Sequence, residues 1–405
     1  MSAPAAPLRI LQVFNQYLDA GGEELWVDRM AMMGDAITEF EDLRFYSRSW
    51  KSRGAPGFFK QALWLGNHPA ARALLREEVA RFKPDALVFH NVIPVGSLGL
   101  YSEATVLGIP IIHYIHNFRP FSPSGTMWFN DRINPDALKG RMWPEVLHAC
   151  WEGAPLRTAI LAFHLKQSIK SGLLEKIDRW VAISDFMKTK FIEAGVPESK
   201  IVKLRHCWKM RLILPPAPES DHYLFLGRLV PEKGVGSLID AWQLLESQLG
   251  KSCPRLIIAG TGPQDAKLRA MARNLKSVSF VGFVSGEKKD SLLRSCRSLL
   301  APSIWWEPLG LIVYEAYDFQ RPVIAANSGG LSETVHPGKT GFLHEPGDPE
   351  AIANAVLACE NLGVSGRASL GVAGRAWLGE NASPEQWLVD FRKMVCGLLN
   401  PNLKS

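Results

Sequence analysis

Short apolar runs recur along this chain, and most of them are followed by a loop and a helix-like stretch. The runs lie at residues 9–14, 86–89, 110–115, 180–183, 223–226, 256–259, 279–281, 298–301 and 322–325. Continuous apolar runs bounded by turn residues are typical of parallel strands that are buried on both faces of a sheet. Such strands, alternating with helices, predict an α/β protein.

The alternation breaks once, which divides the chain into two halves. Around residues 204–214 the pattern fails, and the proline-rich stretch at 215–220 is typical of a stiff linker. A chain of 405 residues suits two domains of roughly 150–200 residues better than one core. We expect two doubly wound Rossmann-like domains facing a cleft, over residues 1–212 and 213–384. An amphipathic helix over 385–405 follows, and its return to the first domain is left open.

Composition excludes several classes of protein. Apolar residues make up 47% and charged residues 21% of the chain, which describes a globular protein and not a disordered one. The net charge of +6 suits a phosphorylated ligand or an anionic surface, but it is too small to indicate nucleic-acid binding. The six cysteines are scattered without a C-x-x-C pair, which favours reduced thiols and a cytoplasmic location. Residues 1–7 lack the features of a signal peptide, and no apolar run reaches the ~18 residues of a membrane span.

The segment from Glu307 to Glu315 places two carboxylates around a Pro-x-Gly turn. It follows the apolar run at 298–301 and opens a helix-like stretch, so it lies at the carboxyl end of a strand, where open α/β sheets bind ligands. Free backbone N–H groups at a helix start attract an anion, whereas carboxylates accept hydrogen bonds from hydroxyl groups. A nucleotide-sugar satisfies both conditions, because it carries a diphosphate and two sets of sugar hydroxyls.

Two cations follow the predicted strand at 223–226. Arg228 offers a planar guanidinium and Lys233 a point charge, a combination suited to holding a diphosphate. The alternative is an exposed strand end with solvated charges. The two-glutamate segment further along the chain favours the ligand interpretation.

Two further turns are weaker signals. Gly262, within the G-T-G-P stretch at 260–263, marks either a tight strand-to-helix turn or a ligand contact. Val284 follows the run at 279–281 and lies either in a plain turn or where the backbone meets a nucleobase edge.

The order and spacing of these motifs over residues 220–360 resemble the retaining glycosyltransferases of family 4, which have the GT-B fold. The E-x7-E segment, the arginine–lysine loop, the G-T-G-P turn and the later Gly329-Gly330 pair carry the resemblance. Single motifs of this kind are weak, and the ordered set is specific.

The resemblance implies a role for each matched residue. In the family the arginine and lysine bind the donor diphosphate, the first glutamate holds the donor sugar and the second binds the ribose hydroxyls. The positions that match are Arg228, Lys233, Glu307 and Glu315, with the backbone of Leu309, Gly310 and Leu311 near the phosphates.

The first half extends the resemblance more loosely. Gly21 and Gly22 resemble the family's glycine loop near the phosphates, with a simple turn as the alternative. The run at 181–184 resembles the strand before the family's acceptor-side helix, which implies an acceptor contact for Ser184.

The segment H-N-F-R at 116–119 resembles the active-site histidine segment of the family. This implies that His116 lies beside the reacting centre and that Asn117 and Arg119 contact the acceptor. The alternative for a histidine at a strand end is a structural group with satisfied hydrogen bonds.

Two positions depart from the family pattern. Leu309 stands where phenylalanine is usual, a change of volume that the loop should tolerate. Gln320 stands where a glycine would permit a left-handed turn, so either the turn is rebuilt or Gln320 adopts a mildly costly backbone.

The expected activity is transfer of a hexose, with retention, from a nucleotide-diphosphate sugar to a saccharide or lipid-linked saccharide in polysaccharide or glycoconjugate biosynthesis. No cofactor or metal is expected, because the chain contains no D-x-D sequence and the two cations can neutralise the leaving phosphate. A nucleotide-sugar epimerase or isomerase and a catalytically silent binding subunit are the alternatives. An oxidoreductase is weaker, because no G-x-G-x-x-G follows the first strand.

The acceptor is the least constrained part of the prediction. Residues 45–64 mix aromatic and basic side chains, which suits peripheral contact with an anionic membrane at its inner face; the alternative, which the composition favours slightly, is a loop and helix that pack their aromatic residues on the core. Residues 121–178 are expected to form an irregular insertion, and whether its tryptophans line an acceptor site by stacking on sugar faces is left open.

Overall fold

Two parallel sheets organise the chain, one in each of two units of a computed structural model that describes residues 7–18, 21–212 and 220–400. The N-terminal unit comprises residues 1–130, 134–206 and 384–405, and the C-terminal unit residues 131–133 and 207–383. The main break falls at 206/207, whereas the sequence pattern predicts it at 212/213. Most of the predicted linker at 215–220 lies outside the described residues. Within the described ranges, no helix combines the length and apolar character needed to cross a bilayer.

The sheet of the N-terminal unit has the strand order β2-β1-β3-β4-β7-β8, and its pairs are parallel. Its strands are β1 (Leu8–Gln16), β2 (Thr38–Tyr46), β3 (Ala86–Phe89), β4 (Ile111–Tyr114), β7 (Arg179–Ala182) and β8 (Ile201–Lys203). Every residue of the central strands β3 and β4 is buried, which explains their continuous apolar sequences. Short strands β5 (Trp128–Phe129) and β6 (Arg132–Ile133) form a separate pair.

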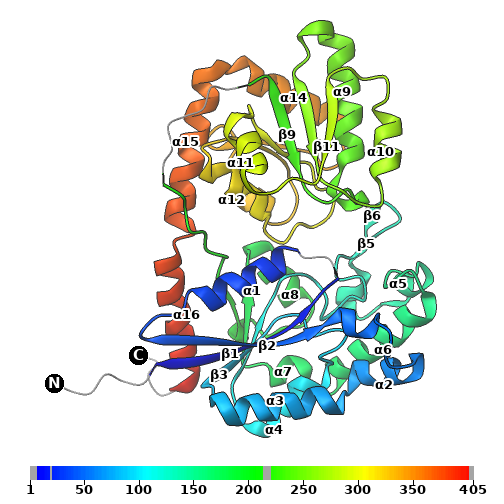
Figure 1. The fold of residues 1–405 in the computed structure, drawn as a ribbon, viewed down its shortest axis with the longest axis vertical. Helices are drawn as coiled ribbons and strands as arrows, with labels where there is room; N and C mark the ends of the chain where they lie inside the picture. Colours follow the sequence, from blue (N-terminus) through cyan, green and yellow to red (C-terminus); the bar gives the residue numbers. More distant parts are fainter. Residues whose placement is uncertain (1–6, 19–20, 213–219, 401–405) are drawn as a thin grey trace, which may run out of the picture. The chain divides into compact units, whose positions relative to one another are not determined.

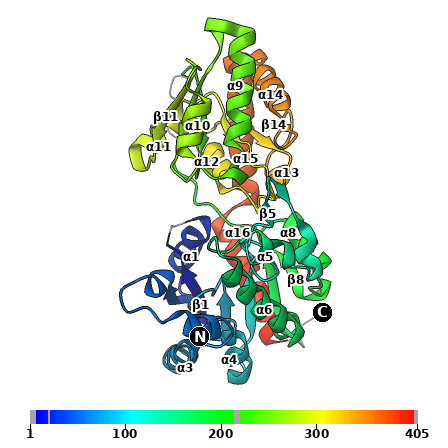
Figure 2. The ribbon, with the colours of Figure 1, turned by 90° about the vertical axis from the view of Figure 1, so that its right-hand side faces the viewer.

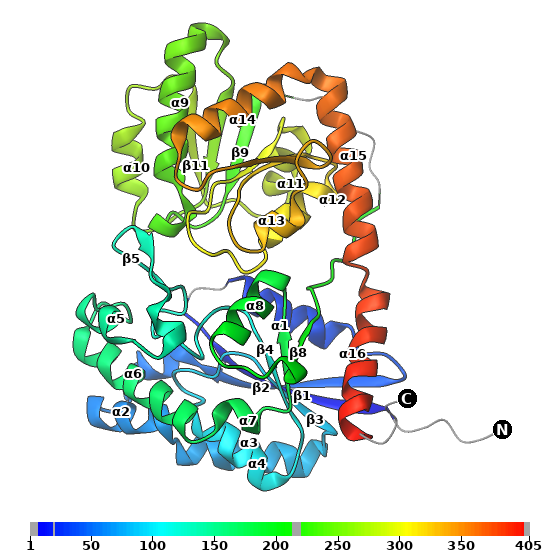
Figure 3. The ribbon, with the colours of Figure 1, turned by 180° about the vertical axis from the view of Figure 1, so that it is seen from behind.

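Helices cover both faces of this sheet. The helices are α1 (Gly22–Met32), α2 (Phe58–Gly66), α3 (Pro69–Phe82), α4 (Gly99–Leu107), α5 (Trp143–Leu147), α6 (Pro155–Lys170), α7 (Leu173–Lys176) and α8 (Asp185–Glu193). Short 3-10 turns lie at Ser47–Trp50, Pro135–Lys139 and Glu198–Lys200. Figures 1 and 3 show α3, α4 and α7 on one face and α1 and α8 on the other.

The C-terminal unit has the strand order β11-β10-β9-β12-β13-β14, again with parallel pairs. Its strands are β9 (His222–Leu226), β10 (Arg255–Ala259), β11 (Val278–Gly282), β12 (Leu299–Ala301), β13 (Val323–Ala326) and β14 (Gly341–His344). In sequence order this is the 3-2-1-4-5-6 arrangement of a Rossmann fold, whose switch point lies between β9 and β12.

Seven helices of the described chain surround the second sheet. They are α9 (Val235–Leu249), α10 (Asp265–Met271), α11 (Gly286–Ser295), α12 (Leu311–Asp318), α13 (Leu331–Thr334), α14 (Pro349–Asn361) and α15 (Gly363–Asn381), with 3-10 turns at Pro231–Lys233 and Gly250–Ser252. Helices α9 and α14 pack side by side, as Figure 2 shows. Trp242 on α9 is fully buried in the core of this unit, against Tyr223 of β9.

The last helix, α16 (Pro384–Leu399), belongs to the N-terminal unit. Trp387, Phe391 and Val395 are buried and recur every fourth residue, so they share one face of the helix. The Trp387 ring lies 5.3 Å from that of Trp26, and Arg392 Nε donates to Thr38 Oγ1 at 2.7 Å.

The predicted α/β class and parallel sheets are confirmed, and the unpredicted strands are informative. Strands β2, β8 and β14 were not identified from sequence, and each lies at the edge of its sheet. An edge strand is not enclosed on all sides, so its sequence can lack the continuous apolar run that marks a central strand; β11, the fourth edge strand, was identified from its run at 279–281. The expectation of an irregular stretch over 121–178 was wrong for its second half, where α6 and α7 form.

The structure also decides the conformation of Gln320. Its φ is +55°, so it occupies the left-handed region in which the family usually has glycine. Gln320 N donates to Tyr317 O and Arg321 N to Ala316 O, both at 2.9 Å, which is the hydrogen-bond pattern of a Schellman motif closing α12. These two bonds offset a backbone cost of about 1–2 kcal/mol.

Candidate functional site

The loops after β9 and β12 meet at the switch point of the C-terminal sheet. Ile304 N donates to Glu232 O at 3.0 Å, which joins the two loops directly. Gly234 has φ +71°, and a Cβ there would lie 2.0 Å from Pro302 O. Only glycine therefore permits this approach, which brings the loop of Lys233 against the loop of Glu307.

Glu307 is held by three donors that converge on one carboxylate oxygen. Its Oε2 accepts from Lys233 Nζ at 2.6 Å, from Ser303 Oγ at 3.0 Å and from Trp305 Nε1 at 3.0 Å. Burial raises the pKa of Glu307, but the Lys233 charge and these bonds outweigh it, so that the pKa lies below its ordinary value. The other oxygen, Oε1, has no hydrogen-bond partner among the described residues and remains available to accept from a ligand.

Glu315 is paired with a lysine that the sequence analysis did not identify. Lys289 Nζ on α11 lies 2.7 Å from Glu315 Oε2, and both side chains are partly buried. Lys289 belongs to no motif and lies 26 positions from Glu315, so nothing in the local sequence marks it. A ligand that uses Glu315 must share that carboxylate with Lys289.

Arg228 and the start of α12 supply further positive character in this unit. Arg228 is exposed, and no described residue forms an ion pair or hydrogen bond with it. Gly310, in the left-handed region, is the N-cap residue of α12, and Leu311 begins the helix. Leu309 is 2% exposed, so its smaller side chain is accommodated in the loop. The free N–H groups at this helix start can bind an anion.

Gly262 and Val284, the two weaker candidates from the sequence, differ in how the surrounding structure accounts for them. A Cβ on Gly262 would lie 2.4 Å from Leu229 O, so this glycine is required by the packing of the loop after β10 against the loop after β9. Val284 is 8% exposed, whereas its neighbour Phe283 is 74% exposed. Packing within the protein is sufficient to require a glycine at 262, and the predicted contact of Gly262 with a donor stays a prediction.

In the N-terminal unit, His116 is hydrogen-bonded to a second histidine at the end of β3. His90 Nδ1 lies 2.7 Å from His116 Nε2, and His90 Nε2 lies 3.0 Å from Gln12 Oε1. Burial lowers the pKa of His116 to about 3 and, together with the neighbouring histidines, lowers the pKa of His90 well below its usual range. Both rings are therefore neutral at neutral pH. His90 was not singled out from sequence, although it directly follows a predicted strand.

His206 completes this cluster of histidines. Its ring stacks on Trp26 at 4.1 Å and lies 5.5 Å from the ring of His116. It is 3% exposed, and neither ring nitrogen has a hydrogen-bond partner among the described residues. Burial and the nearby His116 keep its pKa well below the usual range.

The predicted glycine loop leads into α1. Gly21 is the N-cap residue of this helix, its φ of −134° is ordinary, and its N–H donates to Glu24 Oε2. Gly22 is the first helical residue and is exposed. Next to them, Glu23 accepts from Asn91 N at 3.0 Å and from Asn91 Nδ2 at 2.7 Å. Burial raises the pKa of Glu23 to about 7, although the bonds from Asn91 act in the opposite direction.

The three predicted acceptor residues have internal partners. Asn117 Oδ1 accepts from Arg119 N at 2.9 Å, and the Arg119 guanidinium donates to Pro123 O. Ser184 is fully buried and caps α8, where its hydroxyl accepts from Met187 N at 3.2 Å. Because burial removes the Ser184 side chain from solvent, its hydroxyl is not placed to contact an acceptor.

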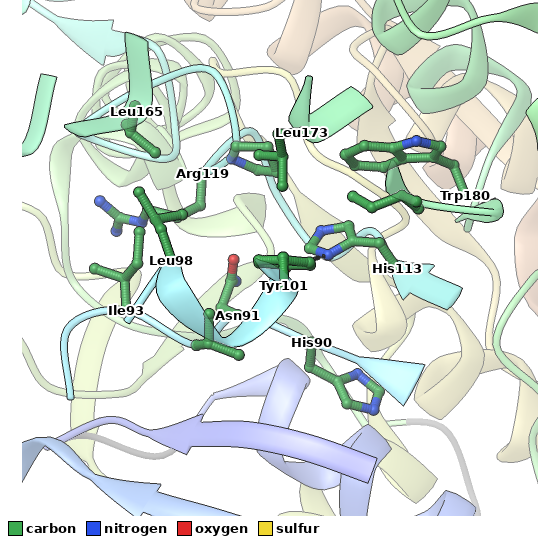
Figure 4. Close-up of a pocket in the computed structure, with 13 residues that line it drawn as sticks. His90, Asn91, Ile93, Leu98, Tyr101, His113, Arg119, Leu165, Leu173 and Trp180 are labelled. Carbon is green, nitrogen blue, oxygen red and sulfur yellow. Dashed lines mark hydrogen bonds between the residues drawn. The ribbon is translucent and has the colours of Figure 1, made fainter. Parts of the chain in front are cut away.

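A small cavity of about 20 Å³ lies behind His90, between the ends of β3 and β4 and helices α4, α6 and α7. Figure 4 shows Tyr101 and His113 side by side there, joined by a 2.7 Å hydrogen bond, with Arg119 at the far end. The volume is enough for about one water molecule and too small for a sugar.

Some aromatic residues at 45–64 pack in the core, as one interpretation predicted, and others are exposed, as contact with a membrane would require. Phe45 and Trp50 are buried in the core, at 5% and 7% exposure. Phe59 and Leu63 on α2 are 82% and 70% exposed, with the exposed Lys60 between them. The core interpretation therefore holds for the strand end, and α2 presents an apolar and basic surface.

Two sequence models of protein families match consecutive parts of the chain. Residues 38–205 match the model described as glycosyltransferase family 4, and residues 208–377 match that of glycosyl transferases group 1. Together they cover most of both units and leave out β1 and α1 at the start of the chain and, at its end, the last residues of α15 and all of α16.

Two individual proteins that resemble the chain share less than a third of its residues in the aligned regions. The alpha-D-kanosaminyltransferase of Streptomyces kanamyceticus is 26% identical over 63% of this chain, and the sulfoquinovosyl transferase of Arabidopsis thaliana is 28% identical over 84%. The alignments span 62% and 60% of those relatives' own lengths. The crystal structure of the Anabaena protein HepE with UDP-glucose matches the fold with a TM-score of 0.66 at 20% identity, covering 96% of this chain and 99% of that one.

Proposed function

The chain belongs to the group 1 glycosyltransferases of the GT-B fold, and from this membership we propose that it transfers a sugar from a nucleotide-diphosphate sugar to a saccharide or lipid-linked acceptor. The pair formed by Lys233 and Glu307 supports the proposal most directly. It lies at the switch point of a Rossmann-type sheet, where such sheets bind nucleotides. A cation beside an oriented carboxylate suits a ligand with both phosphate and hydroxyl groups.

Each group in the C-terminal unit has a proposed part in donor binding. Arg228, Lys233 and the amides at Leu309 to Leu311 hold the diphosphate. Glu307 accepts from donor-sugar hydroxyls through its free Oε1, and Glu315 accepts from the ribose. The exposure of Arg228 and the helix start at Leu311 are consistent with these roles.

The proposed reaction needs stabilisation of a growing negative charge. Cleavage of the anomeric C–O bond leaves a nucleoside diphosphate, and Arg228, Lys233 and the α12 amides offset its charge without a metal. We propose retention by front-face attack, in which the acceptor oxygen forms the new bond and the leaving phosphate takes its proton. His116 lies beside the reacting sugar in this proposal, and Asn117 and Arg119 line the acceptor side.

The acceptor and its location are proposed from the surface of α2. Exposed Phe59 and Leu63 beside Lys60 suit peripheral binding to an anionic membrane on its cytoplasmic face. An acceptor carried by a lipid in glycoconjugate biosynthesis would be presented there. In a flotation assay with vesicles that contain anionic lipid, the wild type should be recovered with the vesicles. The Phe59→Ser/Leu63→Ser variant should remain in the unbound fraction. Equal recovery of both proteins would reject this surface.

Donor binding is the decisive test. Thermal shift with UDP-, GDP- and ADP-sugars should identify one donor, which at a hundredfold excess over its Kd adds about 2.7 kcal/mol of stability. Because HepE was crystallised with UDP-glucose, UDP-sugars are tested first. Lys233→Ala should abolish the shift, and Arg269→Ala, which breaks an exposed pair on α10, should not. A shift that survives in Lys233→Ala would contradict the proposed site, and conversion of the donor without an acceptor would indicate an epimerase.

A further inference from the structure

We propose that Gln12 and His90 are positioning residues that hold His116 in a single tautomer, with its proton on Nε2 and an unprotonated Nδ1. That nitrogen then accepts a hydrogen bond from a hydroxyl group of the bound sugar. The tautomer follows from the ligand-free structure alone, whereas its use in catalysis rests on the proposed function.

The orientation of the Gln12 amide is the first step. Gln12 Nε2 lies 2.7 Å from Asp42 Oδ1 and 3.2 Å from Val27 O, two atoms that accept hydrogen bonds. Arg44 donates to the other carboxylate oxygen of Asp42 at 2.6 Å and keeps that side chain in place. The NH₂ group of Gln12 must therefore face Asp42, which leaves Oε1 facing His90.

The protonation of His90 is the second step. Gln12 Oε1 can only accept, so His90 Nε2, 3.0 Å away, must carry the proton. Gln12 and His90 are both fully buried, and His90 is neutral because burial and the nearby histidines disfavour its charged form. A neutral imidazole with a proton on Nε2 has a lone pair on Nδ1.

The state of His116 follows from that of His90. His90 Nδ1 can only accept, so His116 Nε2, at 2.7 Å, must donate to it. His116 is neutral as well, which leaves Nδ1 without a proton. This nitrogen has no hydrogen-bond partner among the described residues, and the side chain is partly exposed. It is therefore free to accept from a ligand and unable to donate to one.

The opposite tautomer conflicts with the surrounding groups. A proton on His90 Nδ1 would place a lone pair of Nε2 against Gln12 Oε1. Turning the Gln12 amide to correct this would place its oxygen 2.7 Å from Asp42 Oδ1, so that two acceptors would oppose each other. The side chains come from β1, β2 and the ends of β3 and β4, and their hydrogen bonds permit only one arrangement of the protons.

Nitrogen-15 NMR of histidine-labelled, ligand-free protein at neutral pH tests the tautomer directly. We expect a protonated Nε2 and an unprotonated Nδ1 for both His90 and His116, assigned by loss of their signals in His90→Phe and His116→Phe. Gln12→Met keeps the length of the side chain and removes its acceptor, so His116 should then populate both tautomers. Tyr101→Phe removes the partner of His113 outside this chain of bonds and should leave His116 unchanged.

Activity provides the second measurement. With UDP-glucose, or whichever donor the screen identifies, Gln12→Met should lower kcat about three- to tenfold, the loss expected for one hydrogen bond. The KM for the donor should change less in Gln12→Met than in His116→Phe. A proton on Nδ1 of His116 in the wild type, or an unchanged tautomer in Gln12→Met, overturns the inference whatever the activity. Absence of turnover in wild type with every donor rejects the proposed function and leaves the NMR result standing.

Discussion

The two units place different chemistry at corresponding points of their sheets. At the switch point of the C-terminal unit, ionised side chains pair with each other, and the pKa of Glu307 is lowered. In the N-terminal unit the residues after β3 and β4 are histidines that burial keeps neutral, and the pKa of Glu23 is raised. Both sheets are parallel and doubly wound, so the backbone does not account for the difference.

The contrast shows how one architecture can serve two kinds of ligand group. Paired charges at the C-terminal switch point can exchange a protein partner for a phosphate or hydroxyl at little cost, because each partner is already partly exposed. Neutral histidines, as in the N-terminal unit, can form hydrogen bonds with hydroxyl groups and carry no charge that would attract a diphosphate. The difference therefore matches the proposed function, in which charged groups of the C-terminal unit bind the donor phosphates and neutral groups of the N-terminal unit lie beside the reacting hydroxyls.

Among the changes that test this difference between the units, removal of Lys233 should have the largest effect, which is on turnover. Lys233→Ala leaves the partly buried Glu307 without its cation, and we expect a loss of about 2–5 kcal/mol of transition-state stabilisation. Steady-state turnover of the purified variant measures it, with Arg269→Ala as the control for loss of an exposed pair in the same unit. Turnover close to wild type would mean that the charged site is not the donor site.

Glu307 should make the protein sensitive to acid. Its folded pKa is depressed, so its stabilisation is present above the ordinary glutamate pKa of about 4.3 and is lost as pH falls through the lowered folded value. Compared with Glu307→Gln, the wild type should lose on the order of 1–3 kcal/mol more stability across this range, the scale of hydrogen bonds to a charged group. Urea unfolding between pH 3 and 6 measures the difference, and parallel curves would contradict it.

Glu23 should have the opposite effect at higher pH, where the stability of the folded protein should fall as pH rises. Its folded pKa of about 7 lies above the ordinary value, so the folded state retains a proton that the unfolded chain releases, and stability falls as pH rises between the two values. We expect a decline of about 1–2 kcal/mol from pH 5 to 8, a figure reduced because Glu23 is partly exposed. Unfolding of Glu23→Gln should lack this decline. A wild type whose stability rises over the same interval would disprove the assignment.

The smallest effect is expected at Lys289. Lys289→Ala removes a pair whose side chains are 33% and 19% exposed, worth about 0.5–1 kcal/mol. If Glu315 binds the ribose, donor affinity in a titration should change by no more than about fivefold, whereas Glu315→Ala should weaken it further. Equal effects of the two variants would indicate that Lys289 itself contacts the donor.

Sequence patterns predicted the fold further than they predicted the site. The central strands β3, β9 and β10 were identified because burial on both faces requires continuous apolar residues. The edge strands β2, β8 and β14 escaped detection, and so did α6 within a stretch expected to be irregular. For the site, local motifs marked Lys233, Glu307 and Glu315, but their lysine, serine and tryptophan partners carry no local signature.

The sequence by itself determined where most of the central strands lie and which charged residues follow their ends, because periodicity and turn chemistry act over a few neighbouring residues. It also left two outcomes for Gln320, and the closing turn of α12 decided between them. Tertiary structure alone decided the partner of each carboxylate and the proton positions on His90 and His116. Those properties depend on burial and on hydrogen bonds between residues as far apart as Gln12 and His90, which only the folded chain brings together.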